Sequence, residues 1–338
     1  MKTYRFNAEE GLNSLICTET ETPVPAAHEV LVRVRATSLN YRDLMLIENR
    51  YGQPARPGVI PLSDGAGEVV AVGAGVTRAK VGDRVAGTFF AGWIGGPFSR
   101  AAGATQRGSA EDGFLATHRV IGEESFVHIP DYLSYEEAAT LPCAALTAWN
   151  TLTQGRGIRA GDTVLTLGTG GVSLFAVQLA KALGARVVST TSSDKKGERL
   201  TALGADHVIN YSAEPDWHKA VRRVTGGEGV DCVVEVVGAA TLEKSLKSVA
   251  IGGDIGLIGG VGGGKGSLDL VALSQAIVTL RRIIVGSRVD FEAMNRALVV
   301  HKLHPVIDRV FPFADAPAAY RHLASAAHVG KIVIAHDN

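Results

Sequence analysis

The sequence lacks cysteine pairs, a charge excess and long apolar runs. Its three cysteines, Cys17, Cys143 and Cys232, are widely spaced, which excludes a disulfide framework and the paired spacing of a zinc site. Lys plus Arg and Asp plus Glu number 34 each, so no charge excess indicates nucleic acid or an anionic membrane as a partner. No apolar run could span a bilayer, and residues 1–11 lack a signal peptide's apolar region. We therefore expect a cytoplasmic protein.

The most informative stretch is 163–196. Residues 163–167 are mostly apolar and β-branched and predict a buried strand, while apolar residues every three or four positions over 172–183 predict a helix. A second strand is predicted at 186–190. The sequence GTGGVS at 168–173 lies between the first strand and the helix. Strand, glycine turn, helix and strand form the unit that places a dinucleotide pyrophosphate on a helix N-terminus.

Each small residue of this turn has a physical role. Gly168 is expected to make the tight turn, and Gly170 lets the backbone approach the phosphates because it has no side chain. Ser173 stands where a third glycine is usual, and serine is small enough for close packing of helix on strand. The alternative is an ordinary surface loop, but the flanking strands and helix favour nucleotide binding.

Residues after the second strand bear on the choice of cofactor. An NAD site usually has an acid at the strand end for the ribose hydroxyls. Asp194 comes several residues later, where an acid suits the first turn of a helix. The hydroxyls of Ser192 and Ser193 and the charge of Lys196 would instead hold a 2′-phosphate. We expect NADP rather than NAD, with a helix cap and a solvated lysine pair as the alternative interpretation.

The length of 338 residues allows about two domains. Short strands are predicted at 30–36, 65–73 and 81–87 with no long helical pattern, and 91–113 is expected to be a mobile loop. From 135 the pattern changes to alternating helices and strands, which predicts a doubly wound parallel sheet. The helices are expected at 135–149, 217–224, 241–249 and from 270, and the strands at 207–210, 230–237, 253–258 and 283–286. One helix and a strand at 331–334 are expected to return to the first domain.

Three segments in this order resemble the medium-chain dehydrogenase/reductase superfamily: GVTRAKVGDRV at 75–85, LPCAALTA at 141–148 and the glycine turn. The resemblance covers nearly the whole chain. It implies an α/β protein, with a β-rich GroES-like catalytic domain at 1–124 completed by 290–338 and a Rossmann domain at 125–289. It also implies an active site in the cleft between the domains and a homodimer, with edge strands near 283–286 as the contact.

The zinc-dependent members of that superfamily have ligands that this chain mostly lacks. A cysteine is usual in the segment that is SLNYRD at 38–43 here, and a His-Glu pair where this chain has Ser63 and Asp64. Only Cys143 aligns with a ligand, and 87–115 contains no cysteine for a structural lobe. One thiolate and one carboxylate do not make the three protein ligands of a catalytic zinc, so we expect no metal.

Segment 38–43 instead resembles the zinc-free quinone oxidoreductases and the enoyl reductase domains of polyketide synthases. This implies hydride transfer from NADPH to a quinone or to the activated C=C bond of an α,β-unsaturated carbonyl. Charge then develops on the carbonyl oxygen, where hydrogen-bond donors stabilise it, and a phenol can protonate the α-carbon. Tyr41 is the candidate proton donor and Asn40 the orienting group; alternatively, Tyr41 is a pocket wall or a core aromatic. Arg42 and Asp43 are expected to form structural hydrogen bonds.

Further cofactor contacts follow from position in the resemblance. Thr147 is expected to approach the nicotinamide and Tyr211 the adenosine phosphate, with a helix-surface hydroxyl and a strand-end aromatic as alternatives. Lys331 is either a phosphate contact or a surface lysine, and Cys143 is expected to be a small buried packing residue. The full expected cofactor set is Thr147, Gly168, Thr169, Gly170, Gly171, Val172, Thr190, Ser192, Ser193, Lys196, Tyr211, Val237, Gly238, Gly259, Gly260, Val261 and Lys331.

These observations predict a zinc-independent, NADPH-dependent reductase of quinones or α,β-unsaturated carbonyls that acts on small molecules. Two alternatives stay open. One is an alcohol dehydrogenase of the same superfamily, which would need a carbonyl-polarising group in place of the metal. The other is a nucleotide-binding structural protein without turnover, as the lens crystallins of this family illustrate.

Overall fold

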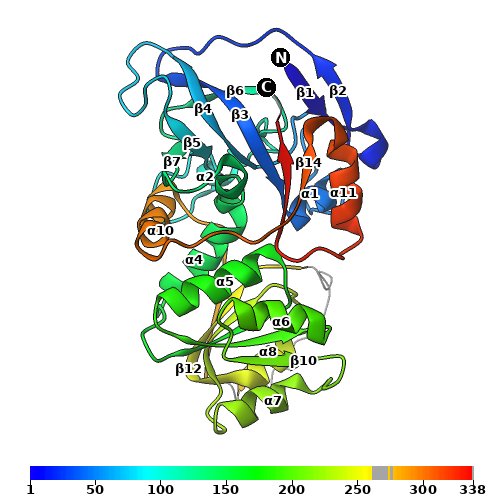
Figure 1. Cartoon of the computed structure of the whole chain (residues 1–338), viewed down its shortest axis with the longest axis vertical. Helices are drawn as coiled ribbons and strands as arrows, with labels where there is room; N and C mark the ends of the chain where they lie inside the picture. The colour runs from blue at the N-terminus through cyan, green and yellow to red at the C-terminus, as the bar shows by residue number, and fades with distance from the viewer. Residues whose placement is uncertain (261–272, 275–276, 337–338) are drawn as a thin grey trace. The chain divides into compact units, whose positions relative to one another are not determined.

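The computed structural model describes residues 1–260, 273–274 and 277–336 and divides into two compact units. The first contains residues 1–146 and 285–338, and the second contains 147–284 (Figure 1). The sequence analysis expected one domain at 1–124 and 290–338 and a second at 125–289. The boundaries of the two compact units differ from these. The reason is pairing between segments that are distant in sequence. β7 (Phe126–His128) pairs with β5 (Arg84–Gly87), and α3 (Tyr135–Ala138) contacts strands of the first unit.

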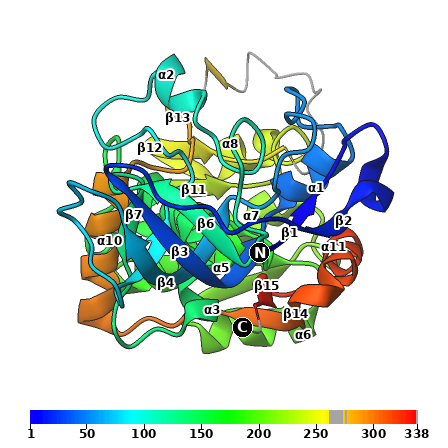
Figure 2. The same cartoon turned by 90° about the horizontal axis from the view of Figure 1, so that it is seen from above.

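The first unit is built on a seven-stranded sheet, and the β-rich domain expected from the sequence is confirmed. Its strand order is β14-β15-β3-β4-β5-β7, with β6 also paired to β3. The long strand β3 (Glu29–Leu39) pairs antiparallel with β4 (Asp64–Val72), β6 (His118–Gly122) and β15 (Lys331–Ala335). Figure 2 shows β14 (Ile307–Pro312) beside β15, with which it pairs in parallel. A separate ribbon joins β1 (Lys2–Arg5) to β2 (Ile16–Glu19).

Several elements of the first unit escaped the sequence analysis. The helix α1 (Tyr41–Ile47) is too short for a periodic pattern, yet it starts directly after β3. The expected single helix over 135–149 is interrupted: α3 is followed by a π-helix at Leu141–Ala145, which contains Pro142, and then by α4 (Leu146–Thr153). The C-terminal segment holds two helices, α10 (Arg288–His301) and α11 (Ala316–Ala324), as well as β14. Short helical turns occur at Gly11–Ser14 and Phe313–Asp315.

The segment 91–113, which the sequence predicts to be a mobile loop, contains contacts between aromatic rings. The rings of Trp93 and Phe98 lie 4.9 Å apart, and those of Phe90 and Phe98 lie 5.1 Å apart, both in edge-to-face contact. The indole N–H of Trp93 donates to the carbonyl of Gly96 at 3.0 Å. A four-residue helix, α2 (Arg100–Gly103), follows. Such aromatic pairs add stability beyond the area that they bury.

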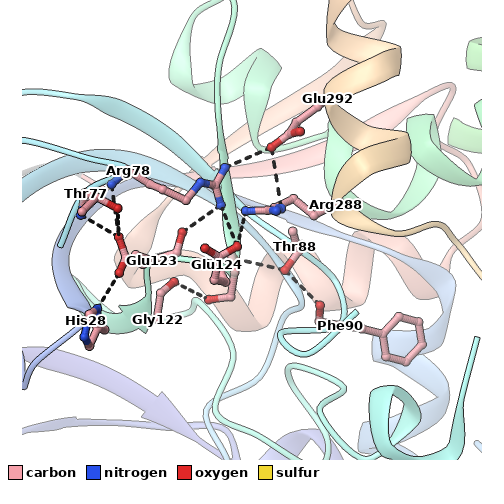
Figure 3. A network of polar contacts seen from close by, with 11 residues as sticks. His28, Thr77, Arg78, Thr88, Phe90, Gly122, Glu123, Glu124, Arg288 and Glu292 are labelled. Carbon is pink, nitrogen blue, oxygen red and sulfur yellow. Dashed lines mark hydrogen bonds and ion pairs between the residues drawn. The ribbon is translucent and has the colours of Figure 1, made fainter. Parts of the chain in front are cut away.

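The GVTRAKVGDRV segment is held by a buried carboxylate. Figure 3 shows Glu123 accepting hydrogen bonds from the backbone N–H of Thr77 at 2.7 Å and of Arg78 at 3.1 Å, and pairing with His28 at 2.7 Å. These contacts lower the pKa of Glu123 to about 2, with the hydrogen bond from the Thr77 backbone as the largest cause. Arg78 also reaches Glu292 of α10 at 3.0 Å, so one network joins four distant parts of the sequence.

The second unit is a six-stranded parallel sheet with strand order β10-β9-β8-β11-β12-β13. The strands are β8 (Thr163–Leu167), β9 (Arg186–Thr191), β10 (His207–Asn210), β11 (Val230–Glu235), β12 (Val249–Leu257) and β13 (Thr279–Arg282). The connecting helices are α5 (Gly171–Ala182), α6 (Asp194–Ala202), α7 (Trp217–Val224) and α8 (Leu242–Ser248). This confirms the expected doubly wound parallel sheet, whose interior is lined by aliphatic residues of the strands together with Trp217.

The end of the second unit differs from the expectation. The last strand is at Thr279–Arg282 and not at 283–286, where Val285 adopts a left-handed conformation with φ of 47° that ends the pairing. The helix expected from 270 begins outside the described residues. No helix in the part of the chain that the structure describes is long and apolar enough to cross a membrane.

Candidate functional site

The glycine turn lies where a parallel sheet of this order binds nucleotides. The central strand β8 has β9 on one side and β11 on the other, so the connections after β8 and β11 diverge at its carboxyl end. Such a divergence leaves a crevice at the strand ends, which is the general ligand position of open α/β sheets. The twelve-residue helix α5 begins there with Gly170 as its N-cap, so its free N–H groups point into this region.

The backbone geometry of the turn is compatible with the separate roles predicted for its residues. Gly168 has φ of +74°, a conformation that favours glycine. No described atom lies within 4 Å of a Cβ added at Gly170, so the space in front of this backbone is open. Ser173 is buried, and its hydroxyl donates to the last carbonyl of β8, that of Leu167, at 2.7 Å. Serine at this position therefore ties helix to strand, a contact that glycine could not make.

The end of β9 presents hydroxyls and a lysine, without an acid at the strand end. Ser193 caps α6, and its hydroxyl oxygen accepts from the backbone N–H of Lys196 at 3.4 Å. The cap interpretation is therefore confirmed, and the hydroxyl hydrogen stays available to donate. Asp194 lies in the first turn of α6, as expected, where it accepts from the amide of Asn210 at 2.8 Å. Within the described residues Lys196 forms no ion pair.

The remaining predicted contacts of the second unit follow the neighbouring strands. Thr190 is buried in β9, Ser192 is exposed just after it, and Tyr211 is 41% exposed directly after β10. Thr147 is buried near the start of α4, which excludes a helix-surface hydroxyl. Val237, Gly238, Gly259 and Gly260 follow β11 and β12, whereas Val261 lies outside the described residues. The structure thus gathers the carboxyl-end residues along one edge of the sheet.

A buried acid that the sequence analysis missed organises this edge. Glu235, the last residue of β11, is fully buried, and its Oε1 accepts from the backbone N–H groups of Val237 and Gly238, each at 2.9 Å. The hydroxyls of Thr241 and Ser245 donate to the same carboxylate at 2.8 and 2.5 Å. In the sequence, an acidic residue at the end of an apolar strand was the feature that could have indicated this role. Its four hydrogen bonds fix the loop that carries Val237 and Gly238.

In the first unit, Asn40 and Tyr41 lie together at the start of α1. Asn40 is the N-cap with extended backbone, and its N–H donates to the Asp43 carboxylate at 2.8 Å. Tyr41 is half-buried and packs against the unit's core, so the core-aromatic interpretation holds for part of its ring. Arg42 reaches Asp43 at 3.3 Å and the hydroxyl of Ser109 at 3.2 Å, which confirms the structural hydrogen bonds expected there. Burial raises the pKa of Asp43 to about 6, while Arg42 opposes the shift.

Lys331 is buried beside Asn40, which excludes the surface-lysine interpretation. Its side chain is 3% exposed. The ammonium donates to the carbonyl of Leu39 and to Oδ1 of Asn40, both at 2.6 Å, and lies 3.6 Å from Oδ2 of the fully buried Asp64. The pairing of β15 with β3 causes this, because Lys331 begins β15 where β3 ends. In the sequence, a lysine at the first position of an apolar strand was the feature that could have indicated this burial.

The Asn40 amide has an unused donor. Its Nδ2 atom is buried and has no hydrogen-bond partner in the part of the chain that the structure describes. An unpaired buried donor costs about 1–3 kcal/mol, so such a group is uncommon without a ligand or water to accept from it. The geometry therefore provides a hydrogen-bond donor for an oxygen atom, on the residue that precedes Tyr41 in the chain.

The zinc-ligand positions hold few groups that could bind a metal. Asp64 accepts from the hydroxyls of Ser38 at 3.2 Å and of Ser63 at 2.8 Å. Cys143, expected to be a small buried packing residue, is half-buried. Burial raises the pKa of its thiol, so it stays protonated at neutral pH. Among residues 1–260, 273–274 and 277–336 there is no group of three or more His, Cys, Asp or Glu side chains placed to hold a metal ion.

Comparison with known proteins identifies two families along the chain. Residues 26–131 match the alcohol dehydrogenase GroES-like domain, and residues 171–299 match the zinc-binding dehydrogenase family. Joined in one chain, a GroES-like domain and a Rossmann-like parallel sheet define an NAD(P)H-dependent oxidoreductase. The chain belongs to the medium-chain dehydrogenase/reductase superfamily.

Relatives in this superfamily carry different names. A zinc-type alcohol dehydrogenase-like protein of Schizosaccharomyces pombe is 41% identical, with 91% of each chain covered. A quinone oxidoreductase of Pseudomonas aeruginosa is 33% identical over 98% of this chain and 99% of its own. An acryloyl-coenzyme A reductase of Metallosphaera sedula is 31% identical over 94% and 95%.

The similar solved structures also carry different names. A protein of Sinorhizobium meliloti 1021 assigned to the alcohol dehydrogenases is 41% identical, with a TM-score of 0.91 and 98% of each chain covered. An NAD-dependent alcohol dehydrogenase is 34% identical, with a TM-score of 0.89 and 99% of each chain covered. A mycobacterial protein complexed with NADPH is 29% identical, with a TM-score of 0.82 over 99% and 100% of the two chains.

Zinc, which one family description implies, does not fit the residues present. A catalytic zinc needs three protein ligands, usually from Cys, His, Asp or Glu. The positions discussed above supply one carboxylate, Asp64, and one protonated thiol, Cys143. The Lys331 ammonium, 3.6 Å from that carboxylate, would also repel a metal cation.

Proposed function

We propose that this oxidoreductase is a zinc-independent, NADPH-dependent reductase of quinones or α,β-unsaturated carbonyls. The observation that carries the proposal is the free donor Nδ2 of Asn40, the N-cap of the helix that Tyr41 begins. The residues that the structure describes contain no group of side chains that could serve as a zinc ligand set. A reductase of this type needs a group that stabilises negative charge on the substrate oxygen. An amide N–H serves that purpose without a metal.

The chain's residues have distinct tasks in this mechanism. NADPH, when bound, supplies the hydride that the β-carbon of the substrate accepts. Asn40 donates from Nδ2 to the carbonyl oxygen, where the enolate charge develops. Tyr41 gives its phenolic proton to the α-carbon, and solvent restores that proton. For a quinone, the same two groups stabilise and protonate the oxygen of the developing hydroquinone.

Cofactor binding is assigned to the edge of the second unit's sheet. The pyrophosphate would bind the N-terminus of α5 through the backbone of residues 168–172. Ser193 would donate its free hydroxyl hydrogen to the 2′-phosphate, and Lys196 would contribute its charge. The absence of an acid at the end of β9 favours NADPH over NADH. The relatives include both an NADPH complex and an NAD-dependent enzyme, so this preference needs its own test.

The alternative is an NAD(P)-dependent alcohol dehydrogenase, a name that several relatives carry. Asn40 would then polarise an aldehyde or ketone carbonyl, and Tyr41 would protonate the alkoxide. Both mechanisms use the same donor, so the substrate panel below distinguishes them.

The test is the initial rate with NADPH and with NADH against quinones, enones, aldehydes and alcohols, with and without a metal chelator. We expect chelator-resistant reduction of quinones or enones with NADPH preferred. Chelator-sensitive oxidation of alcohols would contradict the proposal and show that a metal binds despite the residues described. Tight NADPH binding with no turnover of any acceptor would favour the structural-protein alternative.

We also propose a homodimer. β13 is the edge strand of the described six-stranded sheet and pairs only with β12. An open edge of this kind can pair with a second copy of the chain. Sedimentation velocity measures the mass directly, and a monomer at micromolar concentration would contradict the proposal.

A further inference from the structure

Lys331 makes contacts that differ from those of a phosphate ligand. Its ammonium is buried and donates to two oxygen atoms of consecutive residues, the Leu39 carbonyl and Asn40 Oδ1. Asp64 lies 3.6 Å away as its counter-charge. Two acceptors thus bind the ammonium directly, and the nearby carboxylate balances its charge inside the same unit.

The ammonium determines which end of the Asn40 amide faces it. An ammonium only donates hydrogen bonds, so the carbonyl oxygen Oδ1 must point toward Lys331. The amide nitrogen of the same planar group then points away from Lys331. That nitrogen is the buried donor without a partner described above.

The backbone of Asn40 is held from a second direction. Its N–H donates to Asp43 at 2.8 Å, and Asp43 is in turn paired with Arg42 at 3.3 Å. Both the main chain and the side chain of Asn40 therefore have charged partners. Hydrogen bonds to charged groups are roughly twice as strong as neutral ones, so the amide is fixed before a substrate arrives.

We propose that Lys331 is a positioning residue for Asn40: it holds Oδ1 so that Nδ2 is aimed at the substrate oxygen. The inference rests on the proposed function of Asn40. The ammonium also polarises the amide, because a donor bound to a carbonyl oxygen makes the N–H groups of that amide better donors. Lys331 thus acts on the substrate only through Asn40, and it does not bind a phosphate of the cofactor.

Two other roles of Lys331 make different predictions. As a phosphate ligand, it would contribute to NADPH affinity. As a simple counter-ion of Asp64, it would matter only while that carboxylate is charged. Substitutions at Lys331, Asp64 and Asn40 separate these roles.

The experiment compares Lys331→Met with the double variant Lys331→Met/Asp64→Asn. Methionine keeps the unbranched apolar stem, and asparagine removes the buried carboxylate that would otherwise be left unpaired. We measure kcat and KM for the acceptor that the wild type reduces fastest, and the Kd of NADPH by fluorescence. Lys181→Met is the matched control, because it removes a lysine that pairs with Asp206 at 2.9 Å on the surface.

The positioning role predicts a loss in turnover that the double variant keeps. We expect kcat to fall about tenfold to a hundredfold in both Lys331 variants. This decrease should not exceed the decrease in kcat that follows removal of a whole oxyanion-stabilising donor. The Kd of NADPH should stay within about twofold of the wild type, as in the Lys181 control, because in this role Lys331 does not contact the cofactor. Lys331→Arg, which keeps a buried donor, should recover part of kcat.

A double-mutant cycle with Asn40→Leu tests the route of the effect. Without the amide there is nothing to position, so Lys331→Met should lower kcat no further in that background. Three results would overturn the proposal: full recovery of kcat in the double variant, a tenfold weaker Kd of NADPH, or an undiminished effect in the Asn40→Leu background.

Failure of the proposed function would be visible separately. If the wild type reduces no quinone or enone, the same comparison is made with whichever alcohol or aldehyde it converts. If it converts none, crystal structures of the wild type and of Lys331→Met decide. We expect the Asn40 amide to leave its orientation in the variant, and an unchanged amide would overturn the positioning role.

Discussion

Replacing Glu235 by leucine removes the acceptor of four hydrogen bonds at the end of β11. Two of the donors, the hydroxyls of Thr241 and Ser245, can turn toward other acceptors; the Thr241 hydroxyl already lies 3.4 Å from the carbonyl of Gly238. The backbone N–H groups of Val237 and Gly238 cannot turn in this way. Because each unsatisfied buried donor costs about 1–3 kcal/mol, we expect the free energy of unfolding to fall by about 4 kcal/mol.

The same substitution should affect cofactor binding. Gly238 has φ of +93°, and a Cβ added there would come within 3.0 Å of the carbonyl oxygen of Gly259, so the two loops pack closely. Both belong to the predicted cofactor contacts. Once the carboxylate no longer holds the Val237–Gly238 backbone, we expect the Kd of NADPH to rise about tenfold, equivalent to 1.4 kcal/mol.

Glu235→Gln is the matched control, because glutamine keeps the volume and the Oε1 acceptor. It should cost about 1 kcal/mol through the loss of charge alone. Urea unfolding followed by the fluorescence of Trp217, which is buried in the same unit, measures the stability, and a fluorescence titration measures NADPH binding. A Glu235→Leu variant as stable as Glu235→Gln would refute the reasoning that this carboxylate organises the loop.

Three further predictions concern other sites. Tyr41→Phe should lower kcat for an enone about a hundredfold with little change in the Kd of NADPH, and an unchanged kcat would remove Tyr41 from the mechanism. Ser193→Ala/Lys196→Ala should weaken NADPH binding far more than NADH binding, whereas equal losses would place the 2′-phosphate elsewhere. Glu123 has its pKa lowered from 4.5 to about 2, so its contribution to stability is present above about pH 4.5 and is lost as the pH falls toward 2. The urea midpoint should therefore drop less between pH 5 and pH 3 in Glu123→Gln than in the wild type, and parallel curves would contradict this.

Local patterns were enough to predict most strands of the second unit. The strand β8 and the helix α7 have the bounds expected from their apolar residues, and β10 does as well. Parallel strands that are buried on both faces give continuous apolar runs, and the glycine turn has its own backbone requirements. These signals lie within a few residues of each other, so they can be recognised without knowledge of the rest of the chain.

The first unit was harder because its elements are short or depend on distant partners. The helix α1 has seven residues, and β14 depends on its pairing with β15. In the second unit, the strand expected at 283–286 lies instead at Thr279–Arg282, before Val285 takes a left-handed conformation that no local pattern indicated. Short apolar runs do not by themselves distinguish helix from strand or give exact ends.

The sequence by itself determined the superfamily, the glycine turn and the poor set of zinc ligands, because each depends on residue types at fixed spacing. Only the tertiary structure decided what Lys331 and Glu235 contact. Lys331 is 291 residues from Asn40 in the sequence, and the pairing of β15 with β3 places its ammonium 2.6 Å from the Asn40 amide oxygen. A buried charge is stable only beside its partners, and which residues become partners is decided by strand pairing across the whole chain.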